Sequence, residues 1–286
     1  MIVVTGATGQ LGSRIVGRLL DRVPAAEVVV SVRDPARVTA LAGRGVTVRR
    51  GDFAEPGTLA GAFAGAEQVL VVSVDAFGEA AREQHTAAIR AAVRAGAERV
   101  LYTSHMGAAP DSLFAAMPDH AATEDVLAAA GAPWTSLRNG FYAATVPFLV
   151  GRAVETGRLV APADGPVSWT AHDDLAEAAA VVLAAPGRLD GVTPPLTGSE
   201  ALDLGDVAAI ASDLTGRRVE RVPVDDDEWV ADLRAQGVPE GQAAGMLGIF
   251  RASRRGEFAA VDPTLEQLLG RRPRTVREVL AAHLAR

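Results

Sequence analysis

Two residues that can hold or move a proton lie four positions apart in the stretch MPDHAATEDVL, residues 117–127. His120 and Glu124 would share one face of a helix, because residues i and i+4 are neighbours on a helical surface. We place His120 in the first turn, where the positive helix end disfavours an imidazolium. A neutral His120 could hydrogen-bond a ribose hydroxyl or a substrate oxygen, with Glu124 fixing its tautomer. The alternative is an incidental pair on a surface helix.

The composition removes several other kinds of chemistry. All 28 basic residues are arginine, there is no cysteine, and Tyr102 and Tyr142 are the only tyrosines. A Tyr/Lys pair, a lysine Schiff base, a P-loop lysine, a cysteine nucleophile and a disulfide are therefore excluded. The net charge of −7, without a basic block, gives no support for nucleic-acid binding. We expect a cytoplasmic protein without a signal peptide or a membrane span.

The elements that must position these residues alternate in the first half of the chain. Short apolar runs predict strands, and they alternate with segments of helical periodicity, which is typical of a parallel sheet covered on both faces. We expect strands at 2–5, 27–32, 45–50, 68–74, 98–104 and 133–140, and helices at 10–23, 79–96 and 119–131. The last helix would begin at Asp119 as its N-cap. The predicted fold class is α/β, with a Rossmann-type doubly wound parallel sheet.

After residue 140 the pattern becomes mostly helical, with helices expected at 173–185, 202–216 and 275–285. Thr275 and Glu278 have the spacing of a capping box at the start of the last helix. We predict a nucleotide-binding domain of residues 1–144 with about 172–190. A smaller, mostly helical substrate lobe would comprise about 145–171 and 191–286.

A glycine-rich turn joins the first strand to the first helix in VVTGATGQLGSRIV. Gly6, Gly9 and Gly12 would permit a sharp bend, a close approach of backbone to a pyrophosphate, and tight packing of helix on sheet. The helix N-terminus would add unpaired N–H groups and partial positive charge. A plain strand-to-helix turn is the alternative. We assign to the cofactor site Gly6, Thr8, Gly9, Gln10, Leu11 and Gly12.

The end of the second strand, VVVSVRDPAR, indicates which dinucleotide binds. Arg33 comes first after the strand, where a guanidinium can hold a 2′-phosphate, so NADP(H) is preferred. Asp34 could instead accept a ribose hydroxyl, which leaves NAD(H) possible. It could also serve as the N-cap of a helix with Pro35 at its first position. Arg37 is either a second phosphate ligand or a solvated residue.

Several further motifs follow in a fixed order: SVRDPAR, RRGDF (49–53), VLYTSHMGA (100–108), HAATEDVL (120–127) and SLRNGFY (136–142). Together with the glycine turn they resemble the NmrA-like branch of the atypical short-chain dehydrogenases. Within that branch the sequence is most similar to bacterial NADPH-dependent quinone oxidoreductases. Relatives there often carry His and Glu where the wider superfamily has its Tyr and Lys, and His120 and Glu124 match this pattern.

The resemblance implies roles for further residues. Asp52 and Phe53 would flank the adenine, unless they are a turn aspartate and a core phenylalanine. Backbone of Ser73 and Val74 would lie along the ribose. Ser104, after Thr103 at the end of the fifth strand, is a third candidate catalytic residue beside His120 and Glu124. The nicotinamide side would be formed by Asn139, Gly140 and Phe141.

The missing Tyr/Lys pair argues against alcohol and ketone chemistry and permits quinone chemistry. Reducing an ordinary ketone creates a localised alkoxide that needs a proton donor, which is worth roughly 10²–10⁴-fold in rate. Hydride addition to a quinone instead gives an aromatic hydroquinone anion with a spread charge. Orienting a nicotinamide against such a flat acceptor could suffice. Since the resemblance to quinone oxidoreductases points the same way, we expect an NADPH-dependent oxidoreductase acting on a quinone-type acceptor.

The residues around the acceptor are the least clear part of the sequence. Substrate-binding candidates are His105, Tyr142, Trp169 and His172, with Met106, Phe141 and Phe148 as further members of an aromatic cleft. Each could simply be packing. The run VDDDEW (224–229) is taken as a helix N-terminus rather than a metal site.

Two other functions remain open from the sequence. One is a tailoring oxidoreductase acting on a quinone-like aromatic polyketide or other natural product. The other is an NADP(H)-binding redox sensor without turnover, since NmrA-like proteins include such regulators. A homodimer is possible, and no other macromolecular partner is indicated.

Overall fold

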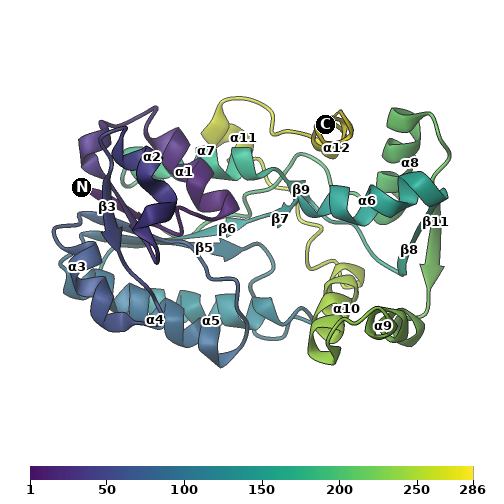
Figure 1. Cartoon of the computed structure of the whole chain (residues 1–286), viewed down its shortest axis with the longest axis horizontal. Helices are drawn as coiled ribbons and strands as arrows, with labels where there is room; N and C mark the ends of the chain where they lie inside the picture. Colours follow the sequence, from purple (N-terminus) through teal and green to yellow (C-terminus); the bar gives the residue numbers. More distant parts are fainter. Residues whose placement is uncertain (286) are drawn as a thin grey trace.

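A parallel sheet of seven strands forms the centre of the computed structural model, which describes residues 1–285 (Figure 1). Its strands are β1 (Ile2–Thr5), β2 (Val28–Val32), β3 (Thr47–Arg50), β4 (Gln68–Val71), β5 (Arg99–His105), β6 (Trp134–Asn139) and β10 (Gly191–Val192). They run in the order β10-β6-β5-β4-β1-β2-β3, with every pairing parallel. Without β10 this is the Rossmann order, which reverses between β1 and β4. The predicted fold class is confirmed.

Helices cover both faces of this sheet because its strands are apolar on both sides. Val4 of β1 packs in one buried cluster and Val3 in the other. The first cluster is closed by α1 (Gln10–Leu19), α7 (His172–Ala184) and α11 (Thr264–Leu269). The second is closed by α3 (Leu59–Phe63), α4 (Glu79–Arg94) and α5 (Ala116–Ala128), while the short α2 (Thr39–Ala42) lies near β3.

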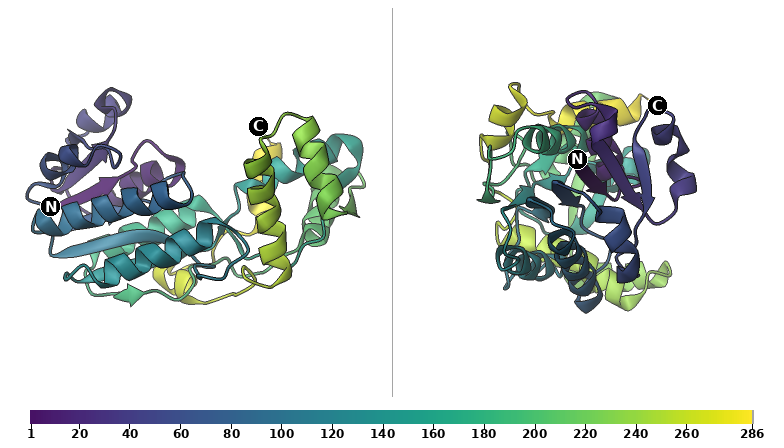
Figure 2. Two further views of the ribbon diagram at one scale, coloured as in Figure 1. Left: turned by 90° about the horizontal axis from the view of Figure 1, so that it is seen from below. Right: turned by 90° about the vertical axis from the view of Figure 1, so that its left-hand side faces the viewer.

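A third buried cluster lies beside the sheet and is mostly helical (Figure 2, left). Its helices are α6 (Thr145–Thr156), α8 (Leu204–Thr215), α9 (Asp226–Ala235), α10 (Glu240–Arg254) and α12 (Val276–Leu284). Two small parallel sheets join them, β8 (Arg158–Pro162) with β11 (Glu220–Val224), and β7 (Phe141–Tyr142) with β9 (Trp169–Thr170). Trp229 stacks edge-on against Phe250 at 5.1 Å and both belong to this core.

The predicted division of the chain into two domains remains a prediction. Residues 172–184 return to the sheet as α7 and pack along α1. Two pieces of the range assigned to the substrate lobe, β10 and α11, also contribute to the sheet or its first core. The first core is therefore built from three separate stretches of chain.

Three expected helix starts are confirmed by their hydrogen bonds. Asp34 accepts from the amide of Ala36 in front of a short 3₁₀ turn with Pro35 at its first position. Thr275 and Glu278 form the capping box of α12. Asp225 caps α9, as the reading of VDDDEW as a helix start requires. No helix within residues 1–285 is both long and apolar enough to cross a bilayer.

Candidate functional site

A cleft of about 920 Å³ runs along the carboxyl ends of the central strands. Side chains from the turn after β1, the ends of β2 to β5, and helices α4, α5, α7 and α10 line it. A cleft at the point where the strand order reverses is the usual ligand site of an open α/β sheet. Its volume lies within the range of roughly 300–1,000 Å³ that is typical of cofactor and substrate sites.

The glycine turn forms one end of the cleft. Gly6 has φ +64°, a backbone angle that residues with a side chain rarely adopt. An added Cβ on Gly12 would lie 2.2 Å from the Gly6 carbonyl oxygen. The N-cap of α1 is Gly9, no side chain caps the helix, and its first turn contains no acidic residue. Open N–H groups and an uncompensated helix dipole suit a pyrophosphate. All six residues assigned to this turn line the cleft, and they fit a dinucleotide.

Next to the turn, the ends of β2 and β3 form a polar region. Arg33 is exposed, lines the cleft, and has no ion-pair partner within residues 1–285. Asp34 is not among the lining residues, and its carboxylate is already used as a cap. The hydroxyl of Ser31 is buried in this wall without a hydrogen-bond partner. A free guanidinium and an unsatisfied hydroxyl favour a phosphorylated ribose here.

Four residues assigned from the resemblance also line the cleft, but some of their polar groups already form hydrogen bonds within the protein. The carboxylate of Asp52 accepts from the amide of Ala54, as in an ordinary turn. The amides of Ser73 and Val74 donate to Thr103 Oγ1 at 2.9 Å and to His85 Nε2 at 3.0 Å. Phe53 keeps an apolar surface toward the cleft. Of the backbone groups of Ser73 and Val74, only the carbonyls are left for a ribose.

The centre of the cleft holds His120, and its bonded neighbour is Tyr102. The phenolic oxygen of Tyr102, on β5, lies 2.7 Å from His120 Nδ1. Tyr102 is fully buried, and a buried tyrosine hydroxyl normally finds a partner. Burial lowers the pKa of His120 to about 4, although the nearby Glu124 carboxylate opposes this shift. His120 is therefore a neutral imidazole at physiological pH.

The hydrogen bonds around Tyr102 determine which nitrogen of His120 carries the proton. His85 Nε2 accepts from the amide of Val74, so His85 carries its proton on Nδ1 and cannot accept there. Thr123 Oγ1 donates to the carbonyl of Asp119 and lies 3.1 Å from His85 Nδ1. The short distance to His120 Nδ1 favours donation from the Tyr102 hydroxyl, and with it the tautomer of His120 that carries its proton on Nε2. His120 is thus a hydrogen-bond donor at its free nitrogen.

The expected role of Glu124 as the partner of His120 is wrong. The Glu124 carboxylate is buried and accepts from Ser104 Oγ and Ser136 Oγ, each at 2.8 Å. Arg138 pairs with it through Nε at 3.0 Å and Nη2 at 2.6 Å. These four bonds use both carboxylate oxygens, so Tyr102 and not Glu124 selects the tautomer. Ser104 lines the cleft, but its hydroxyl proton points to Glu124.

The start of helix α5 also differs from the prediction. The helix begins at Ala116, with Ala115 in the N-cap position, so Asp119 is not a cap and His120 lies in the second turn. Asp119 instead accepts from the amide of Gly78 at 2.6 Å and faces Arg82 at 3.4 Å. It ties the loop before α4 to α5. Burial, rather than a position in the first turn, keeps His120 neutral.

Part of the cleft lining is aromatic. His105, Phe141, Tyr142 and His172 line the cleft, and the rings of Tyr142 and His172 lie 4.2 Å apart. Burial lowers the pKa of His105 to about 3. Three large apolar side chains that the sequence did not single out also line the cleft: Phe77, Phe114 and Ile249.

Other residues expected near the nicotinamide or substrate do not line the cleft. Trp169 packs against Phe141 and donates its indole N–H to the carbonyl of Leu202. Asn139 is buried at the end of β6, and the space beside Gly140 is filled by Thr170 and Leu196. Met106 is buried outside the cleft, and Phe148 is exposed on α6. Trp169 packs behind the lining residue Phe141, whereas the exposed Phe148 supports no wall of the cleft.

Residues 1–285 contain no cluster of three His, Asp or Glu side chains arranged to hold a metal. In the acidic run, Asp226 pairs with Arg251 and Arg254, which lowers its pKa. The site thus combines the glycine turn, the neutral His120 and several aromatic side chains in the lining of one cleft.

The sheet order, the glycine turn and the cleft define an α/β dinucleotide-binding protein. Residues 6–186 match the family described as NAD(P)H-binding, which is more than half of the chain. The chain belongs to this family, and the predicted cofactor class is confirmed.

Comparison with individual proteins supports the same family. The chain is 34% identical over 279 residues to quinone oxidoreductase 2 of Escherichia coli, covering 97% of this chain and 96% of that protein. It is 32% identical over 286 residues to an NAD(P)H azoreductase of Xenophilus azovorans, covering 100% and 98%. The crystal structure of an E. coli NADPH-dependent quinone oxidoreductase in complex with NADPH superposes with a TM-score of 0.93, at 32% identity over the whole of both chains. The resemblance seen in the motifs is confirmed.

Proposed function

We propose that this protein is an NAD(P)H-dependent oxidoreductase that transfers hydride to a quinone-type acceptor and prefers NADPH. One observation carries the proposal: the glycine turn, the neutral His120 and several aromatic side chains all line a single cleft. The relatives named as a quinone oxidoreductase and an azoreductase support it. The cysteine-free sequence favours a cytoplasmic location.

The chain's own residues would hold and orient the reactants. Open amides of the turn from Gly6 to Gly12 would bind the pyrophosphate, and Arg33 the 2′-phosphate. When bound, reduced NADP supplies the hydride. Phe114, Phe141 and Ile249 would pack against a flat acceptor and exclude water from it.

His120 would act on the acceptor as a neutral hydrogen-bond donor. Its Nε2–H can donate to a quinone oxygen, which gains negative charge as the ring accepts hydride. Full proton transfer from His120 would leave an imidazolate or require a buried tyrosinate, and burial raises the pKa of Tyr102. The aromatic hydroquinone anion does not need this proton at once and can take it from water. The site therefore suits quinones better than ordinary ketones.

The direct test mixes the purified protein with NADPH and benzoquinone or menadione, follows absorbance at 340 nm, and uses NADH in parallel. We expect rapid oxidation with NADPH preferred. Tight NADPH binding by calorimetry without oxidation by either quinone would contradict the proposal. The alternatives would then be a tailoring reductase of a quinone-like natural product or a redox sensor.

Replacement of His120 by Phe measures the share of catalysis that depends on the donor. Because rearomatisation drives the reaction, we expect appreciable quinone turnover to remain in His120→Phe. A loss beyond roughly 10⁴-fold in kcat would make His120 an essential acid and would exclude this mechanism. Unchanged NADPH affinity, measured by calorimetry, is the control for an intact cofactor site.

A further inference from the structure

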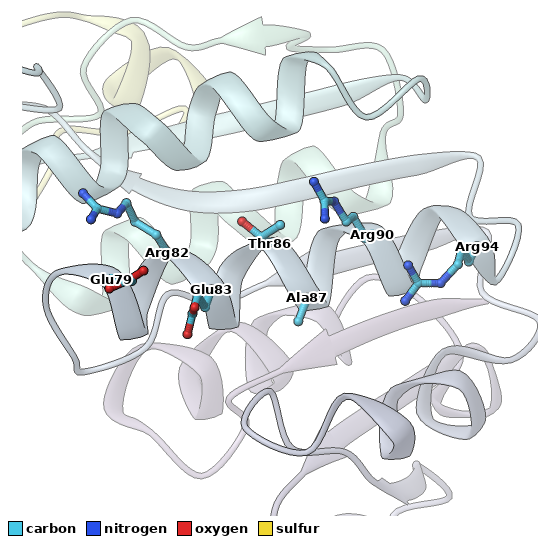
Figure 3. Close-up of a pocket in the computed structure, with 7 residues that line it drawn as sticks. All are labelled: Glu79, Arg82, Glu83, Thr86, Ala87, Arg90 and Arg94. Atoms are coloured by element: carbon cyan, nitrogen blue, oxygen red, sulfur yellow. The ribbon is translucent and has the colours of Figure 1, made fainter.

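The outer face of α4 carries a line of charged residues that none of the contacts described so far uses. Figure 3 shows them along a shallow hollow of about 520 Å³, separate from the cleft. Glu79 and Glu83 lie at the start of the helix, and Arg90 and Arg94 at its end. All four are exposed, and none forms an ion pair within residues 1–285. Thr86 and Ala87, both small, lie between them.

This order of charges contains two unfavourable pairs within one helix, although Arg82, which pairs with Asp119, lies three residues from Glu79 on the same hollow. Glu79 and Glu83 are four residues apart, as are Arg90 and Arg94, so like charges are neighbours at both ends. Such pairs destabilise a helix by about 0.2–0.5 kcal/mol each. The helix dipole favours acids at the start and bases at the end, but its effect falls off within the first and last turn. It therefore does not explain Glu83 or Arg90, which lie in the second turn from each end.

The same order is favourable when two copies of α4 lie antiparallel. Positions 79 and 94, and positions 83 and 90, are equally distant from the midpoint between Thr86 and Ala87. A two-fold axis through that midpoint places each glutamate of one copy opposite an arginine of the other. Four complementary pairs result, two on each side of the axis. The small residues at the centre allow the helix axes to approach closely.

We propose that the α4 face, defined by Glu79, Glu83, Thr86, Ala87, Arg90 and Arg94, is an interface between two copies of this chain. The contact is isologous, because the same residues of both copies meet across the axis. The α4 face points away from the cleft, because α4 lines the cleft with other residues, Ala81, Gln84 and His85. The dimer therefore leaves both clefts open.

Charge-reversal variants test this arrangement, with sedimentation velocity as the measurement of mass. Arg90→Glu with Arg94→Glu puts four acids at positions 79, 83, 90 and 94, and Glu79→Arg with Glu83→Arg puts four bases at the same positions. We expect each variant alone to be monomeric, with a dimer dissociation constant at least tenfold higher than that of wild type. A 1:1 mixture of the two should dimerise, because opposite charges then meet at every position.

A swap of all four residues in one chain completes the test. The quadruple variant reverses the order but keeps the net charge at −7, and we expect it to dimerise like wild type. The control Arg44→Glu with Arg152→Glu removes two arginines at exposed sites elsewhere and should remain dimeric. Circular dichroism and NADPH binding verify that each variant is folded.

The results that would overturn the proposal are equally definite. They are a monomeric wild type at 100 µM protein and low salt, double variants that still dimerise alone, or a mixture that stays monomeric. A dimer that is unaffected by 0.5 M salt would also exclude these pairs, since exposed charges are strongly screened at that ionic strength.

Discussion

At the scale of residues, His120 depends on a tyrosine that does not itself reach the acceptor. Tyr102→Phe removes the hydroxyl that donates to Nδ1 and lets the ring adopt its other tautomer. Losing one neutral hydrogen bond is worth about 0.5–1.5 kcal/mol, so we expect kcat with a quinone to fall roughly 3- to 10-fold. The KM for NADPH should change little.

A double-mutant cycle distinguishes this role from general destabilisation. If Tyr102 acts through His120, the pair Tyr102→Phe and His120→Phe should be no slower than His120→Phe alone. Additive losses in kcat would show that Tyr102 acts by another route.

Arg33 carries the predicted choice between the two dinucleotides. Arg33→Ala should raise the Kd for NADPH by about 10- to 100-fold, as expected for a charged hydrogen bond worth roughly 1.5–3 kcal/mol. The Kd for NADH should stay within about twofold, because NADH lacks the 2′-phosphate. Calorimetry with both dinucleotides measures this. Arg37→Ala, next to the same strand end but outside the cleft lining, is the matched control. Equal weakening of both dinucleotides would contradict the assignment.

The sequence was most informative where the conformation of the backbone restricts which residue can stand at a position. The glycine spacing predicted the turn from Gly6 to Gly12, because a residue with a side chain does not fit the backbone geometry at Gly6 and Gly12. It could not predict that Glu124 would pair with Arg138, since these side chains come from different elements and meet only when α5 packs on β6. Spacing along one helix indicated only that His120 and Glu124 share a face.

At the scale of elements, α1 contains two glycines that differ in their surroundings. Gly12→Ala would place Cβ against the Gly6 carbonyl, whereas Gly17 has nothing within 4 Å of an added Cβ. We expect Gly12→Ala to lower the free energy of unfolding by about 1–3 kcal/mol and to weaken NADPH binding. Gly17→Ala should raise stability by up to about 1 kcal/mol and leave binding unchanged. Urea denaturation and calorimetry measure both effects, and equal behaviour of the two variants would refute the role of the turn.

Element ends were predicted less well than element types, for a physical reason. The fourth strand was expected at 68–74, but β4 ends at Val71. Beyond that point the amides of three residues bond to side chains, Val72 to Thr5, Ser73 to Thr103 and Val74 to His85. Apolar residues therefore continue where the strand pairing has stopped. Local sequence cannot reveal such partners from distant parts of the chain.

At the scale of the whole molecule, buried histidines connect stability to pH. Burial lowers the pKa of His85 to about 3, below its ordinary value of 6.5. The unfolded chain then binds a proton that the folded chain does not, so this contribution is complete above pH 6.5 and is lost as pH falls toward 3. The slope is about 1.4 kcal/mol per pH unit for one such group. We expect urea denaturation to show a steep loss of stability between pH 6 and pH 4.

His85→Asn isolates the contribution of this histidine. The free energy of unfolding of this variant should depend less steeply on pH than that of wild type. The difference in slope should correspond to about one bound proton. His283→Asn, at the exposed end of α12, should leave the slope unchanged. An identical slope in wild type and His85→Asn would contradict a buried neutral His85.

The return of α7 and α11 to the sheet has a consequence for how the protein is made. The core that packs against α1 includes Leu175, Leu183, Leu265 and Leu268, so it spans almost the entire length of the chain. A ribosome that has released only the first 150 residues exposes a nascent sheet with one apolar face that α1 covers but α7 and α11 do not yet cover. The dinucleotide turn can therefore be made rigid only near the end of translation, and until then that open face is a natural binding surface for chaperones.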